Sequence, residues 1–128
     1  MKIEIEIAER EIDSNHSRAK AWSGIGALVE FSGIVRDMEE GRQITALRYE
    51  AYQPMAENQM RRILESLHAL YPCLRVKVLH RIGVVPVGQS AIYISVEAEH
   101  RAEAFALASE FMNRIKQDVP IWKTEVLS

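Results

Sequence analysis

A helix-forming pattern near the end of the chain, with an extended segment on each side of it, most constrains the fold. Residues 101–117 carry apolar side chains at helical spacing, and Pro120 ends this helix. An apolar segment over 91–96 precedes the helix, and residues 121–127 after it can add an edge strand. The apolar stripe of the helix is formed by Phe105, Ala108, Met112 and Ile115. This order predicts a mixture of helix and sheet, with charged side chains at the junctions between elements.

The remainder of the chain alternates strand-forming and helix-forming patterns. Residues 2–8 alternate isoleucine with charged side chains, as a half-buried strand does. Apolar residues at steps of four and three over 56–70 predict a second long helix, which Pro54 begins and Pro72 ends. Three more strands are predicted, over 27–36, 44–52 and 74–83.

Some expectations concern how these segments connect. The strands over 27–36 and 44–52 are expected to form a hairpin, with residues 37–43 as a mobile loop at its tip. Gly33 indicates a bulge or a close backbone approach inside the first of these strands. Residues 84–88 are expected to form a connection between two later strands.

A short third helix is predicted over 16–22, after several residues that can cap a helix. With this helix included, the order of elements predicts an α+β sandwich with a largely antiparallel sheet and three helices. A length of 128 residues is enough for one domain with its own core, so a single domain over residues 1–128 is expected.

Composition and charge argue against several classes of function. The formal net charge is −2, so no overall field attracts nucleic acid. Cys73 is the only cysteine, which excludes an internal disulfide and fits a reducing compartment. No apolar run approaches the roughly 18 residues of a membrane span, and the alternating N-terminus is unlike a signal peptide, so a cytoplasmic protein is expected. The four histidines show no ligand spacing, so no metal site is expected.

Two lysines near the C-terminus are candidates for chemistry. Lys116 lies about 20° from Phe105 on a helical wheel, so it is expected to border the buried stripe. The alternative is a solubilising lysine that is favoured by the helix dipole. Lys123 follows Trp122, and if the tryptophan points inward, strand alternation puts the lysine on the opposite face.

Paired basic residues stand at other junctions. His100 and Arg101 begin the last helix, where side chains and free backbone N–H groups together can bind a phosphate. The alternatives are a capping or core histidine and a surface arginine. His80 and Arg81 form a second pair at a strand end, for which a structural role is favoured. Arg36 ends a strand and opens the 37–43 loop.

The spacing of these residues predicts a shared site. Arg101 and Lys116 are fifteen residues apart on one helix, which separates them by roughly 22 Å. One small ligand cannot easily contact both. Either they serve different sites, or two copies of the chain meet in a twofold dimer, with His100 and Arg101 of one copy near Lys116 and Lys123 of the other.

Five blocks of the sequence, in the same order, resemble the catalytic (large) subunit family of molybdopterin synthase. The resemblance covers about residues 25–125, and the first 24 residues match only loosely. The blocks are FSGIVR (31–36), YEAYQPMAE (49–57), HRIG (80–83), HRAEAF (100–105) and KQDVPIWKTE (116–125).

The resemblance implies a fold, a reaction and partners. The fold is an α/β-hammerhead-like sandwich. The reaction converts cyclic pyranopterin monophosphate to molybdopterin by adding two dithiolene sulfurs. The sulfur arrives as a thiocarboxylate on the C-terminal Gly-Gly of a small ubiquitin-like carrier subunit. The family enzyme is a dimer of large subunits with one carrier at each end, and no cofactor is expected.

The resemblance also assigns roles to residues. Lys116 has the main chemical role, as acid and base or as an attacking amine, because a partly buried lysine loses its proton more readily, and Lys123 assists it. The residues expected to contact the substrate are Arg36, His100 and Arg101, flanked by Ile34, Val35, Thr124 and Glu125. The channel for the carrier tail is expected to be lined by Phe31 and Met112.

Two other functions remain open. The chain can be a non-catalytic module that captures a partner's C-terminal tail, although the presence of both lysines argues against it. It can also be an unrelated α+β protein that binds phosphoesters.

Overall fold

The computed structural model describes residues 1–13 and 24–128, and its elements alternate strands with two long helices. The strands are β1 (Lys2–Ala8), β2 (Ala27–Ile34), β3 (Met38–Glu39), β4 (Arg42–Gln43), β5 (Ala46–Ala51), β6 (Arg75–Arg81), β7 (Gly83–Pro86), β8 (Ser90–Ala98) and β9 (Ile121–Leu127). The helices are α1 (Met55–Leu70) and α2 (Arg101–Asp118). The predicted strands near the N-terminus and the C-terminus and both long helices are therefore confirmed.

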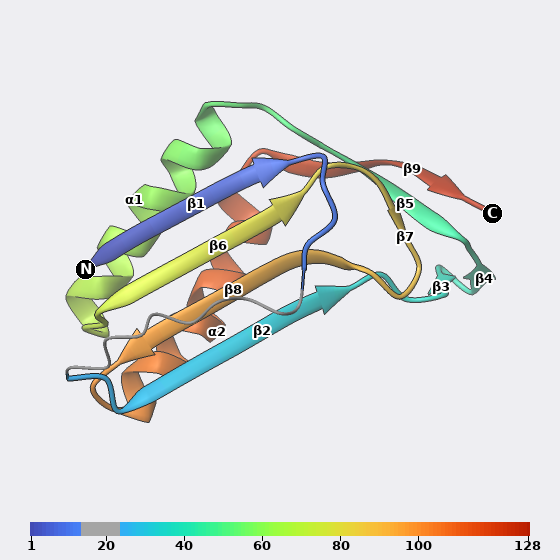
Figure 1. Ribbon diagram of the computed structural model, residues 1–128. Coiled ribbons are helices and arrows are strands. Elements are labelled where there is room, and N and C mark those ends of the chain that lie inside the picture. The colour runs from blue at the N-terminus through green and yellow to red at the C-terminus, as the bar shows by residue number, and fades with distance from the viewer. Residues whose placement is uncertain (14–23) are drawn as a thin grey trace.

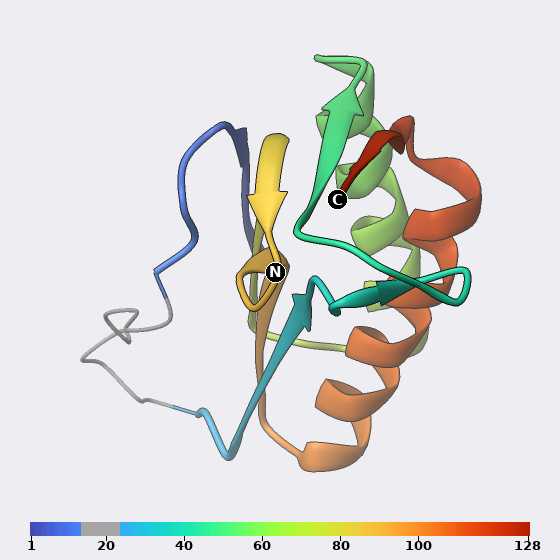
Figure 2. The same ribbon diagram turned by 90° about the vertical axis from the view of Figure 1, so that its right-hand side faces the viewer.

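The larger sheet has four strands in the order β1-β6-β8-β2, and both helices cover one of its faces (Figure 1). Strand β1 runs parallel to β6, while β6 and β2 are both antiparallel to β8. Figure 2 shows α1 and α2 together on the same side of this sheet. The main core lies between the two layers, and it includes the fully buried side chains of Met60, Leu64, Ile94 and Phe111. Each such side chain contributes about 1.5–3 kcal/mol by leaving water.

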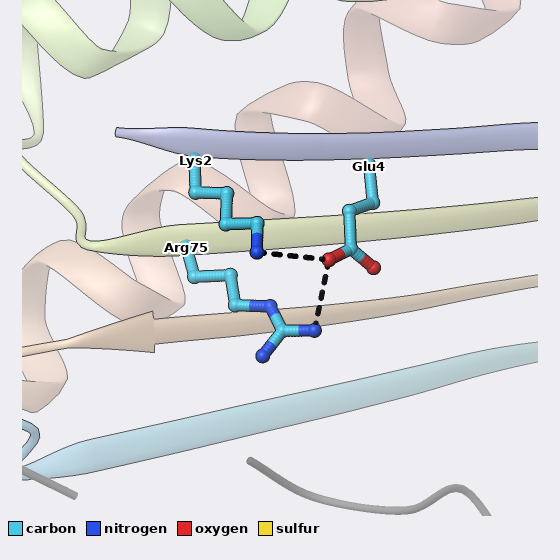
Figure 3. A network of polar contacts seen from close by, with 3 residues as sticks. All are labelled: Lys2, Glu4 and Arg75. Atoms are coloured by element: carbon cyan, nitrogen blue, oxygen red, sulfur yellow. Dashed lines mark hydrogen bonds and ion pairs between the residues drawn. The ribbon is translucent and has the colours of Figure 1, made fainter. Parts of the chain in front are cut away.

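The other face of the larger sheet carries polar side chains. In Figure 3, Glu4 accepts a hydrogen bond of 3.0 Å from Arg75 of the neighbouring strand, and the ammonium group of Lys2 lies 3.8 Å from the same oxygen. The Tyr93 hydroxyl donates a 2.5 Å hydrogen bond to Glu30. Alternation along the strands produces this division, because the isoleucines of β1 point to the helices and its charged residues point away.

A second, three-stranded sheet has the order β7-β5-β9, and all its pairings are antiparallel. It lies at the end of the larger sheet where β2 and β6 finish (Figure 1). Its own apolar cluster consists of Val35, Ile44, Leu47, Val85 and Ala91. Strand β9 is an edge strand, as predicted, and it follows directly from the end of α2.

The structure corrects the predicted hairpin over residues 27–52. Strand β2 pairs with β8, whereas β5 pairs with β7 and β9. Val29 and Phe31 face Val96 and Ile94 of β8 on the helix-covered side, so β2 completes the larger sheet. Leu47 of β5 instead pairs with a residue of β7 and packs in the second cluster. Apolar periodicity identifies a strand but not its partner.

Further differences are local. The predicted connection over 84–88 begins with strand β7, and the predicted loop over 37–43 contains the small hairpin of β3 and β4. The described residues form two helices instead of three, and the helix predicted over 16–22 falls in the part of the chain that the structure does not describe. The α+β class with largely antiparallel pairing is confirmed, although the strands divide among separate sheets. No helix within 1–13 and 24–128 is long and apolar enough to cross a membrane.

Candidate functional site

A cavity of about 480 Å³ opens where the two sheets meet the end of α2. The end of β2, the residues just after it, the last turn of α2 and the start of β9 all contribute to its walls. Seven of the predicted site residues line it, namely Phe31, Ile34, Val35, Arg36, Met112, Lys116 and Lys123. Segments far apart in the sequence are therefore brought together around one space.

Apolar side chains form much of the cavity wall. Phe31 and Met112 both line it, and their role in a channel for a peptide tail stays a prediction. Trp122 and Ile34 also line it and remain 45% and 55% exposed. Large apolar groups at this exposure are available for contact with a ligand.

Three cations face the same cavity. Arg36 follows β2, Lys116 is in the last turn of α2, and Lys123 is on β9. The C-terminal end of the helix dipole favours the positive charge of Lys116. Within the described part of the chain, neither Arg36 nor Lys116 has an ion-pair partner, whereas the Nζ atom of Lys123 lies 3.3 Å from an oxygen of Glu39. The cavity can therefore bind an anion.

The surroundings of the two lysines differ from those predicted. Lys116 is exposed at the rim of the cavity and is not partly buried in the single chain. Trp122 does not point into the core, and it lines the same cavity as Lys123. The ladder between β5 and β9 has a bulge at this point, because Tyr49 pairs with Lys123 while Arg48 pairs with Glu125. A bulge changes the local twist and so modifies simple alternation.

The other predicted site residues lie outside the cavity. His100 and Arg101 are at the N-terminal end of α2, opposite the end that carries Lys116. Thr124 and Glu125 are on β9, and Glu125 accepts a 2.8 Å hydrogen bond from the side chain of Arg48. The single chain thus brings the two lysines together and leaves the His-Arg pair apart, so the dimer remains a prediction.

Three titratable residues of the cavity wall were not predicted as parts of the site. Glu39 lies on β3, in the segment expected to be a mobile loop. Tyr49 and His80 also line the cavity, and their rings meet edge to face. His80 follows Val76 and Val78 in strand alternation, and this signal indicates a side chain on the apolar face.

Burial changes the acid–base properties of this wall. Desolvation lowers the pKa of His80, although a contact of 2.9 Å between its Nδ1 atom and the carbonyl oxygen of Arg81 acts in the opposite direction. Desolvation raises the pKa of Tyr49, and the negative charge of Glu39 raises it further. Both side chains are thus favoured in their neutral forms. The described residues contain no cluster of side chains suited to a metal ion.

The comparisons with known proteins agree with the resemblance. The family model described as MoaE protein matches residues 7–118. The human molybdopterin synthase catalytic subunit is 41% identical over 101 residues, which cover 79% of this chain and 54% of the human protein. The subunit of the same name from Thermoplasma volcanium is 41% identical over 102 residues, which cover 80% of this chain and 74% of that protein.

The fold of the chain is also similar to that of a solved molybdopterin synthase. The crystal structure of molybdopterin synthase from Staphylococcus aureus has a TM-score of 0.85 and 32% identity, and the match covers 96% of this chain and 90% of that one. The chain spans about half the length of the human and rice relatives. With a family model that covers residues 7–118 and relatives of the same name in human and archaeal sources, this chain belongs to the MoaE protein family.

Proposed function

We propose that this chain is the catalytic subunit of a molybdopterin synthase. It converts cyclic pyranopterin monophosphate to molybdopterin by adding two dithiolene sulfurs, which are taken from the C-terminal thiocarboxylate of a small carrier subunit. The observation that carries this proposal is that Lys116 and Lys123 reach one cavity from two different elements, beside Arg36 and an apolar wall. That combination suits a reaction between a bound anion and a peptide tail.

The anionic part of the substrate has suitable partners. A cyclic phosphate needs a cation with several donors, and the guanidinium group of Arg36 supplies them at the edge of the cavity. Lys116 adds a second cation without an ion-pair partner in the described residues. We assign these two groups to the first binding of the phosphate.

The carrier tail has a suitable passage. A Gly-Gly terminus has no side chains and can enter a narrow space between apolar walls. Phe31 and Met112 line the cavity on the side of β2 and α2, and Phe31 is 42% exposed. Contact with them would bring the terminal thiocarboxylate towards Lys116.

The chemical role falls to Lys116. It acts as acid and base for the sulfur transfer, or its amine attacks the thiocarboxylate carbonyl. In the second case the carbon–sulfur bond breaks, the sulfur passes to the substrate, and the acyl group stays on the lysine until water hydrolyses it. Lys123 stabilises the charge that develops. As a base or as an attacking amine Lys116 acts from its neutral form, which desolvation favours. As an acid it acts from the protonated form, which is also the form that binds the phosphate. Because Lys116 is exposed in the single chain, the bound tail and substrate are what would exclude water from it.

A second copy of the chain completes the site in this proposal. His100 and Arg101 lie at the far end of α2 from Lys116, so within one copy they cannot contact the same small molecule. In a twofold dimer they would reach the neighbouring cavity and hold the phosphate and the pterin.

A reconstitution experiment tests the proposal. The purified chain is mixed with thiocarboxylated carrier and cyclic pyranopterin monophosphate, and the dithiolene product is measured. Formation of the product supports the proposal. Tight binding of the carrier without product would support the alternative, a module that only captures the tail. Absence of both binding and product would contradict both functions.

A further inference from the structure

Glu39 brings a negative charge into a cavity that otherwise presents cations. Among the residues that line the cavity, it is the one acidic side chain beside Arg36, Lys116 and Lys123. It lies on β3, which pairs with β4 in a hairpin of two residues on each side. The hairpin thus carries the carboxylate to the cavity from outside both main sheets.

Of the three cations that line the cavity, Glu39 forms its ion pair with Lys123. Its Oε1 atom lies 3.3 Å from the Nζ atom of Lys123, and the two side chains are 25% and 47% exposed. Arg36 and Lys116 line the same cavity without an ion-pair partner in residues 1–13 and 24–128. One of the three cations is therefore neutralised and held, while two are available to a ligand.

We propose that Glu39 is a positioning residue for Lys123, which it orients in the cavity and keeps from capturing the anionic group of the substrate. A lysine on an edge strand has a flexible stem and many conformations, and an ion pair reduces their number. An ion pair at this exposure adds little to stability, so its effect falls on orientation and charge.

A second observation supports the influence of this carboxylate on the cavity. The charge of Glu39 raises the pKa of Tyr49, which is the residue opposite Lys123 in the ladder of β5 and β9. The field of the carboxylate thus reaches the cavity wall. The inference rests in part on the proposed function, because one of its two tests measures turnover. The other test measures the binding of a simple anion and does not depend on the proposed function.

The test compares Glu39→Gln with Glu40→Gln. Glu40 is the next residue in the hairpin, is exposed and does not line this cavity, so its substitution is a control with the same change of charge. We expect Glu39→Gln to lower kcat at least about threefold, because Lys123 loses its orientation. We expect it to tighten the binding of inorganic phosphate about two- to fivefold, because Lys123 becomes available to the anion. Glu40→Gln should change neither quantity.

A double variant separates positioning from a simple effect of charge. In a Lys123→Ala background, Glu39→Gln should no longer tighten phosphate binding beyond the change produced by Glu40→Gln. If the tightening persists there, Glu39 acts on the anion directly and the inference is wrong. An unchanged kcat for Glu39→Gln in an active enzyme, or no binding of phosphate by the unsubstituted chain, would also overturn it.

The two proposals fail in different ways. If the unsubstituted chain binds phosphate but yields no dithiolene product with the carrier, the proposed function fails. In that case the phosphate titrations of the single and double variants still decide whether Glu39 controls Lys123.

Discussion

The ring of His80 meets the ring of Tyr49 edge to face, with centroids 5.7 Å apart and an angle of 71° between the ring planes. His80 ends the buried face of β6 in the larger sheet, and Tyr49 is on β5 in the smaller one. The contact therefore joins the two sheets at the cavity wall, where His80 is buried and Tyr49 is partly buried.

Acidification should destabilise the fold through His80. Burial lowers the pKa of His80 in the folded protein, so the unfolded chain binds the proton first as the pH falls. The stability that this group contributes is present above the ordinary pKa of histidine and is lost as the pH drops through the folded value. Urea unfolding between about pH 7.5 and about pH 5 should show a steeper loss for the unsubstituted chain than for His80→Gln. Equal pH dependence in the two proteins would contradict the prediction.

The thiol of Cys73 should be inert in the folded protein. It is 3% exposed, and burial, aided by the charge of Glu103, raises its pKa to about 11. Little thiolate is then present at about pH 8, so reaction with a disulfide reagent should be at least about a hundredfold slower than in urea. Unfolding should release one equivalent, since the sequence has one cysteine. Rapid reaction without urea would mean that this side chain is accessible.

Replacement of Lys116 should separate turnover from carrier binding. The amine is at the rim of the cavity, whereas the apolar wall for the tail comes from other residues. Lys116→Ala should therefore lower turnover at least about a hundredfold and change the affinity for the carrier less than about twofold. Lys77→Ala, on a strand away from this cavity, is the matched control and should leave both unchanged. Loss of the complex itself would show that Lys116 is a docking residue.

Mixed subunits should recover activity if the site is shared. Arg101 and Lys116 lie at opposite ends of α2, so Arg101→Ala and Lys116→Ala would damage different halves of a composite site. A dimer with one subunit of each variant retains one intact site of two, and about half of the dimers in an equal mixture are of this kind. Mixing two inactive variants should therefore restore up to about a quarter of the unsubstituted activity. The measurement is turnover after subunit exchange has been demonstrated by mass spectrometry. No recovery after such exchange would argue for a site within one chain.

A methyl group at Gly26 should strain the entry to β2. The backbone N–H of Gly26 donates a 2.9 Å hydrogen bond to the carbonyl of Ala98, and an added Cβ would lie 2.1 Å from the carbonyl oxygen of Glu99. Because that oxygen belongs to the backbone, Gly26→Ala should lower the free energy of unfolding by about 1–3 kcal/mol. Ser32→Ala, at an exposed position of β2, should change it by less than about 0.5 kcal/mol in urea unfolding.

Local patterns in the sequence were sufficient for the two long helices, for the longer strands and for the three cations of the cavity. The steps of four and three over residues 56–70 predicted α1, and the alternation over 2–8 predicted β1. Lys116 and Lys123 were found because they stand at junctions, and junctions of consecutive elements such as α2 and β9 must lie near each other in space.

Long-range pairing could not be predicted in the same way. The choice of β8 as the partner of β2 depends on apolar side chains more than sixty positions away, such as Val96 opposite Val29. Glu39 was missed because its polar surroundings resemble a loop, and its position depends on a hairpin of only two residues on each side. The exposure of Lys116 depends on which other groups cover the cavity. A helical wheel describes a single helix and gives no information on its neighbours.

The parallel pairing of β1 with β6 has a consequence for biosynthesis. Of the described strands, β1 precedes the others along the chain and has its register partner at residues 75–81, and β2 pairs with residues 90–98. Both outer strands must therefore wait for the central pair of β6 and β8, and the sheet is expected to grow outward from that pair once most of the chain has been synthesised. Until then the isoleucines of β1 are exposed to other nascent chains and to chaperones.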